Sequence, residues 1–161
     1  MESRWPYSAG PRTWLKVITR WDYNMKTKLK HARSAVLLVA GTLLILIGAS
    51  ILLSPVDFYA TNNIELGKNI SLINEIKAPA GLLLVAGAFM IRAIFVRRIT
   101  DTALSLAALV YLTYALSRSA SMVSDGLPVT GLVQAAALEG FIGITCLLVL
   151  LASKNQPRTI V

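Results

Sequence analysis

The sequence predicts an all-α integral membrane protein, a four-helix bundle with up-down topology. The first reason is composition, because 55% of the residues are hydrophobic and only 15% are charged, whereas a soluble domain has about 45–50% and about 25% of these residues. The second reason is a series of four apolar runs of about the length needed to cross a bilayer, separated by polar connectors. We expect one transmembrane domain over residues 34–153 and a cytoplasmic tail over residues 154–161.

The first span is predicted over residues 35–53. This run contains no charged residue, and as a helix it would be about 28 Å long, close to the thickness of the hydrocarbon core. A secretory signal peptide is the alternative, but the apolar run is longer than the usual stretch of about 7–15 residues, and no clear small-residue cleavage site follows it. We therefore expect an uncleaved anchor that ends at Ser54-Pro55.

The second and third spans are predicted as an antiparallel hairpin. The second covers residues 78–96, with an extra turn or two upstream because isoleucines recur there at near-helical spacing. The third covers residues 102–118 and has the shortest uncharged core of the four. Only the short basic segment around Arg97 and Arg98 separates them, so the two helices should lie side by side.

The fourth span is predicted over residues 130–152. Asp125-Gly126 marks a turn before it, and Pro128 suits the first turn of a new helix. This span contains one acidic residue, Glu139, about ten residues from its start and therefore about 15 Å deep, near the middle of the membrane.

The segment before the first span, residues 1–33, is strongly basic and accounts for most of the net charge of +8. Together with Arg97, Arg98 and Lys154, its basic residues predict by the positive-inside rule that both termini are cytoplasmic. We expect the tail to contact anionic lipid headgroups. Because these charges account for topology, no nucleic-acid partner is expected.

Apolar and aromatic residues recur at helical spacing within this basic tail. They are Trp14, Ile18, Trp21, Met25 and Leu29. The pattern is typical of an amphipathic helix lying in the membrane interface. A partly disordered basic tail is the alternative, and the sequence does not decide between the two.

A buried polar cluster is predicted around Glu139, because an ionisable group within a span costs about 2.5–3.5 kcal/mol on insertion and therefore needs a partner or a function. Tyr111, Tyr114 and Arg118 share one face of the third span, which runs antiparallel to the fourth. We expect Glu139 to meet the two tyrosine hydroxyls, with Arg118 reaching toward it. The cluster would be either a hydrogen-bonded clasp that fixes helix packing or a proton-relay or ligand site.

A second set of polar residues is predicted at the outer membrane surface. Glu75, Lys77 and Asp125 lie near the ends of their spans, where Asp125 would pair with Arg118 or Lys77. Such surface pairs contribute little stability on their own. They would line an outward-facing polar pocket, or they are simply solvated charges.

The polar positions resemble those of small bacterial four-helix membrane proteins classified only as a domain of unknown function, distantly similar to the DoxX-like group. The residues that carry the resemblance are Glu75-Ile76-Lys77-Ala78, Gly81, Arg118, Asp125-Gly126-x-Pro128 and Glu139. It covers about residues 35–152. The family commonly has an arginine and paired glycines near the second span, where this chain has Lys77 and Ala80-Gly81. The resemblance implies a location in the bacterial inner membrane, a fold and polar positions, but no reaction.

We expect a non-catalytic accessory or assembly subunit, because the sequence contains no nucleophile–base pair, phosphate-binding loop or metal motif. Gly41, Gly48 and the segment Ala136-x-x-x-Gly140 offer surfaces for close packing against larger membrane proteins or a second copy. The alternatives are a small oligomeric transporter or proton- or quinone-handling protein that uses Glu139, and a membrane enzyme acting on a lipid or quinone. With a single cysteine and a single histidine, no metal or cofactor is expected.

Overall fold

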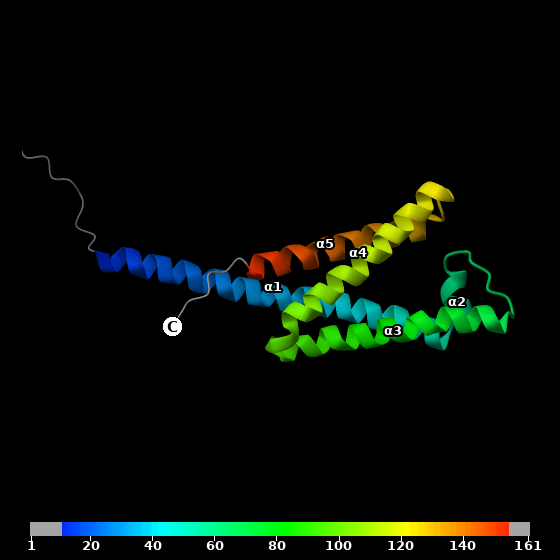
Figure 1. The fold of residues 1–161 in the computed structure, drawn as a ribbon, viewed down its shortest axis with the longest axis horizontal. Coiled ribbons are helices and arrows are strands. Elements are labelled where there is room, and N and C mark those ends of the chain that lie inside the picture. The colour runs from blue at the N-terminus through cyan, green and yellow to red at the C-terminus, as the bar shows by residue number, and fades with distance from the viewer. Residues whose placement is uncertain (1–10, 155–161) are drawn as a thin grey trace, which may run out of the picture.

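The computed structural model describes residues 11–154, with side chains at Met25 and from Thr27 onward. Within this range the chain is helical and has no strand (Figure 1). The elements are α1 (Pro11–Leu53), α2 (Pro55–Ala60), α3 (Ile70–Phe95), the 3-10 turn η1 (Arg97–Ile99), α4 (Thr100–Ser124) and α5 (Thr130–Lys154). The prediction of an all-α four-helix bundle is confirmed.

Four helical segments among the described residues are long and apolar enough to cross a membrane. They are Thr27–Leu53, Ile70–Phe95, Arg97–Ser124 and Thr130–Lys154. Large apolar side chains such as Leu82, Val85 and Leu109 remain exposed on the outside of the bundle, as expected for a surface that faces lipid. The protein is therefore a multi-pass membrane protein.

Helix α1 continues without interruption from the basic segment into the first span. No glycine or proline occurs between Arg12 and Ala40, so nothing in the sequence breaks the hydrogen-bond ladder before the apolar run begins. Residues 11–26 precede the span and would extend it by about 24 Å at the helical rise. The side chains of Trp14, Ile18 and Trp21 lie outside the described residues, so the amphipathic pattern stays a prediction.

The long connector after α1 contains more structure than a polar loop. Ser54 leaves the helical conformation, and Pro55, which suits a first helical turn, starts α2. Asn63 and Gly67 have positive φ angles of 57° and 59° and turn the chain back. Asn69 then caps α3, because its side chain accepts a hydrogen bond from the Leu72 amide at 3.2 Å. Helix α3 thus begins two turns before the predicted span of 78–96, where the isoleucines recur.

The helices form two closely packed pairs, and glycines allow the close approach of α1 and α3. A Cβ atom on Gly87 would lie 2.6 Å from the Gly41 carbonyl oxygen, and one on Gly48 would lie 2.8 Å from the Ala80 carbonyl oxygen. These distances are too short for any side chain, so glycine is required where the two backbones cross. Gly41 and Gly48, expected to face partner subunits, instead pack within the chain.

Small residues also join α4 to α5. A Cβ atom on Gly143 would lie 2.7 Å from the Leu112 side chain, and one on Gly140 would lie 3.7 Å from the Ala115 Cβ atom. Ala136 is buried in the same contact region. The Ala136–Gly140 surface is thus also used inside the bundle, because the short connector before α5 holds it antiparallel to α4.

The two pairs are tied together at one end of the bundle, which we call the η1 end (Figure 1). There the Thr100 hydroxyl donates to the Ala93 carbonyl oxygen at 3.1 Å, and Arg33 forms an ion pair with Asp101. At the opposite end, which we call the α2 end, the pair α4/α5 diverges from α1/α3, and α2 lies between them. The two pairs therefore diverge toward the α2 end (Figure 1).

Candidate functional site

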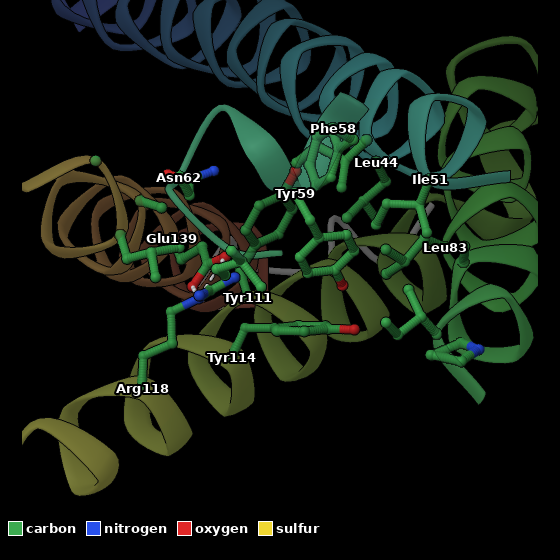
Figure 2. Close-up of a pocket in the computed structure, with 18 residues that line it drawn as sticks. Leu44, Ile51, Phe58, Tyr59, Asn62, Leu83, Tyr111, Tyr114, Arg118 and Glu139 are labelled. Carbon is green, nitrogen blue, oxygen red and sulfur yellow. Dashed lines mark hydrogen bonds and ion pairs between the residues drawn. The ribbon is translucent and has the colours of Figure 1, made fainter. Parts of the chain in front are cut away.

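A cavity of about 320 Å³ occupies the space between the two helix pairs toward the α2 end (Figure 2). Most of its wall is apolar. Leu44, Ile51 and Leu83 contribute from the pair α1/α3, and Phe58 contributes from α2. All four side chains of the predicted polar cluster also line this cavity, and they are described in turn below. The sequence argument therefore selected residues that the fold brings to one place.

Arg118 on α4 and Glu139 on α5 form a direct ion pair at the wall of the cavity. The Arg118 Nε atom donates to Glu139 Oε2 at 3.0 Å and to Oε1 at 3.3 Å. The side chains are 34% and 15% exposed, respectively. An arginine is suited to this position because its charge persists and its planar fork matches a carboxylate. The two charges compensate each other, so this region of the cavity wall carries no net charge.

The Tyr111 hydroxyl does not hydrogen-bond to Glu139, contrary to the prediction. Its hydroxyl donates to the Ala40 carbonyl oxygen of α1 at 2.7 Å, and its side chain is only 3% exposed. Ala40 and Ala107 are both fully buried, so α1 and α4 approach closely enough there for the hydroxyl to reach the α1 backbone. Tyr111 thus joins the two helix pairs across the inner wall of the cavity.

Tyr114 and Tyr59 bring two more hydroxyl groups to the cavity wall. Both side chains are half-buried. Among the described residues, neither hydroxyl has a hydrogen-bond partner, and on Arg118 only Nε has one. Among these residues the predicted hydrogen bond between Tyr114 and Glu139 is not formed either. The cavity therefore has hydrogen-bonding groups that the protein itself does not use.

The sequence analysis missed the contribution of α2 and the loop after it. Phe58 and Tyr59 pack edge to face, with ring centroids 5.5 Å apart, and both line the cavity. Asn62 follows and lies against the first turn of α5, where a Cβ atom on Gly131 would be only 2.8 Å from its Oδ1 atom. The adjacent aromatic residues after Pro55 were the available indication, since aromatic residues gather at membrane interfaces.

The outer-surface residues are not brought together. Glu75 is exposed and Lys77 is half-buried, and neither lines the cavity. Asp125 accepts a hydrogen bond from the Ser121 hydroxyl at 2.8 Å, so its predicted pairing with Arg118 is wrong, because the Arg118 side chain turns to Glu139 instead. Asp125 does line a neighbouring hollow to which Arg118 also contributes.

No group of three or more His, Cys, Asp or Glu residues within the described part of the chain is arranged to hold a metal ion. The only cysteine, Cys146, is fully buried in the core and lies outside the cavity wall. The groups of the cavity wall that could contact a ligand are thus an ion pair, hydroxyl groups and apolar side chains.

A family model described as a domain of unknown function, DUF4345, matches residues 32–150. No curated protein matches the chain, and no solved structure matches it, so the distant similarity to the DoxX-like group stays a prediction. The match covers the second and third membrane spans completely. It leaves out only residues 27–31 of the first span and residues 151–154 of the fourth. The chain therefore belongs to the DUF4345 family.

Proposed function

We propose that the protein binds a small, uncharged amphipathic molecule from the bilayer in the cavity between its helix pairs. The ligand would have an apolar body and one oxygen-bearing end, the chemical class that includes quinones. The observation that carries the proposal is the cavity itself, whose wall is largely apolar yet presents an ion pair and hydroxyl groups without internal partners.

The size of the cavity supports a small ligand. At about 320 Å³ it lies near the lower end of the range of about 300–1,000 Å³ for small-molecule sites. Such sites are mostly apolar, with a few polar groups that orient the ligand. A single ring with its substituents fits this description better than a whole phospholipid does.

The charge of the cavity supports an uncharged ligand. Arg118 is already neutralised by Glu139 at 3.0 Å, so a ligand carboxylate would have to displace Glu139, and a ligand cation would face the guanidinium. A carbonyl or hydroxyl oxygen, in contrast, can accept from the remaining N–H groups of Arg118 or from the Tyr114 hydroxyl without disturbing the pair. Such hydrogen bonds are stronger where water is scarce.

The proposal is tested by filling the cavity. Ala135 lines the cavity, so Ala135→Phe should abolish binding of a short-chain benzoquinone, measured by equilibrium dialysis with the purified protein in nanodiscs. Ala137, two residues along α5, is exposed and lies outside the cavity wall, so Ala137→Phe is the matched control and should bind as the wild type does. Equal binding by both variants, or no saturable binding by the wild type, would refute the proposal.

A second candidate function is that of an accessory or assembly subunit, and the N-terminal part of α1 favours it. Residues 11–26 continue the helix beyond the first span and extend past the other helices (Figure 1). A helix outside the bundle provides a surface for another protein without using the glycine faces, which are occupied within the chain. Purification in mild detergent with and without residues 1–24 tests this idea, and it fails if no stoichiometric membrane protein is lost on truncation.

A further inference from the structure

A second, smaller hollow lies at the η1 end of the bundle, remote from the cavity described above. It has a volume of about 250 Å³ and is lined by Lys30, Arg33, Ser34, Ile94, Arg97 and Thr100. These residues come from α1, from the end of α3, from η1 and from the first residue of α4. We call this hollow the basic pocket. It is formed where the two helix pairs are tied together, so its walls come from three separate helices.

The charge of the basic pocket is strongly positive. Three of its six lining residues are cationic and none is acidic. Among the described residues, neither Lys30 nor Arg97 takes part in an ion pair, while Arg33 is held by Asp101. Neighbouring positive charges without counterions attract anions, because their fields add within the hollow.

The hydrogen-bonding capacity of the basic pocket is also incompletely used. The Arg33 Nε atom is buried and has no acceptor within the described part of the chain. Its terminal nitrogen reaches Asp101, which fixes the side chain against the pocket wall. The Ser34 hydroxyl has no hydrogen-bond partner among the described residues either, whereas that of Thr100 is committed to Ala93. A multi-oxygen anion would complement this arrangement.

The position along the helices indicates where such an anion would come from. Arg33 immediately precedes the uncharged run of α1, and Arg97 immediately follows the apolar part of α3. Both therefore lie at the depth where the hydrocarbon core meets the headgroups. Ile94, one helical turn before Arg97 and deeper in the membrane, gives the hollow an apolar side.

We infer that the basic pocket binds the phosphate group of an anionic phospholipid. The phosphodiester oxygens would be held by Lys30, Arg33 and Arg97, and the glycerol carbons would lie against Ile94. Basic pockets between membrane helices bind headgroup phosphates by this combination of charge and depth. The inference is independent of the proposed ligand of the larger cavity, because the two share no lining residue.

The test compares adjacent arginines. Both side chains are exposed, but Arg97 lines the pocket and Arg98 does not. We expect the wild-type protein in detergent micelles to retain phosphatidylglycerol in preference to phosphatidylcholine, measured by native mass spectrometry. Arg97→Gln should weaken retention by about ten-fold, because charge-assisted hydrogen bonds are lost. Lys30→Gln should act in the same direction, and Arg98→Gln should change retention by less than about two-fold, because Arg98 does not line the pocket.

Three outcomes would overturn the inference. The first is equal loss in Arg97→Gln and Arg98→Gln, which would indicate general attraction to the basic surface. The second is no preference of the wild-type protein for phosphatidylglycerol. The third is displacement of the lipid by inorganic phosphate at equal concentration, which would assign the pocket to a free phosphate ion. Thermal unfolding of each variant shows that the fold is kept, and Lys30→Gln provides a second substitution if Arg97→Gln does not fold.

Discussion

The Nε atom of Arg118 on α4 donates to both carboxylate oxygens of Glu139 on α5, at 3.0 Å and 3.3 Å. The pair therefore links two neighbouring helices of the bundle and also forms part of the cavity wall. A group in this position has two measurable properties, its contribution to stability and its contribution to ligand binding. Each can be followed separately with substitutions that the structure suggests.

Removing one member of the pair should destabilise the protein more than removing both. We expect Glu139→Leu to lower the free energy of unfolding by about 1–3 kcal/mol, because Arg118 is left partly buried without its partner. The double variant Arg118→Leu with Glu139→Leu should recover most of this loss. Thermal unfolding in detergent measures both, with Asp125→Asn as an exposed control. If the effects of the single variants Arg118→Leu and Glu139→Leu simply add in the double variant, the residues are not coupled.

The hydroxyl groups of Tyr111 and Tyr114 should have different roles. Tyr111→Phe removes the hydrogen bond to the Ala40 carbonyl oxygen and should cost about 0.5–1.5 kcal/mol of stability. Tyr114→Phe should leave stability unchanged, because its hydroxyl has no partner among the described residues, but should weaken quinone binding. Unfolding and equilibrium dialysis on the same two preparations check the contrast. A loss of stability in Tyr114→Phe together with a loss of quinone binding alone in Tyr111→Phe would contradict these two roles.

The crossing of α1 and α3 should not tolerate a side chain at Gly87. A Cβ atom there would lie 2.6 Å from the Gly41 carbonyl oxygen, so Gly87→Ala should lower stability by about 1–3 kcal/mol through overpacking. Gly81, on the same helix, has no atom within 4 Å of its Cβ position. Gly81→Ala should therefore stabilise the helix by roughly 0.5–1 kcal/mol. Effects of equal sign in thermal unfolding would contradict the close backbone contact.

The orientation of the bundle can be checked with reporter fusions. We expect fusions at Asn63 and Ser124 to report the non-cytoplasmic side and a fusion after Lys154 to report the cytoplasm, because basic residues are concentrated at the η1 end. Asn63 lies three residues after the end of α2, and Ser124 is the last residue of α4, at the opposite end of that helix from η1. Cytoplasmic signals from both positions would mean that the bundle is inverted.

The sequence was sufficient to predict the four spans, because an apolar run of about 20 residues has few alternatives to a membrane helix. It was also sufficient to select Arg118 and Glu139, because charges within spans are costly and must be accommodated. Periodicity alone placed Tyr111 and Tyr114 on the same face of α4. These predictions depend on the helical periodicity of the residues and on their position within an apolar run, and both can be read from a single sequence.

The predictions that failed depended on which helices approach most closely. Tyr111 meets the Ala40 carbonyl group rather than Glu139, and Gly41 packs against Gly87 rather than a partner subunit. A helical face rich in small residues looks the same whether it meets another span of the chain or a second protein. The role of Tyr59 was missed because the conformation of the connector between α1 and α3 depends on the helices against which it packs.

The tie at the η1 end has a mechanical consequence for the other end of the bundle. From Thr100 to Arg118 the α4 backbone extends about 27 Å at the helical rise. If the pair α4/α5 pivots about η1, each degree of rotation displaces the Arg118 backbone by about 0.5 Å over this lever arm, while the walls near Ala93 and Thr100 hardly move. Asn62, lying against Gly131, spans the gap at the far end of that lever. Tyr111 joins the two pairs part-way along this lever arm, so the width of the cavity depends on that hydrogen bond as well as on the tie at η1.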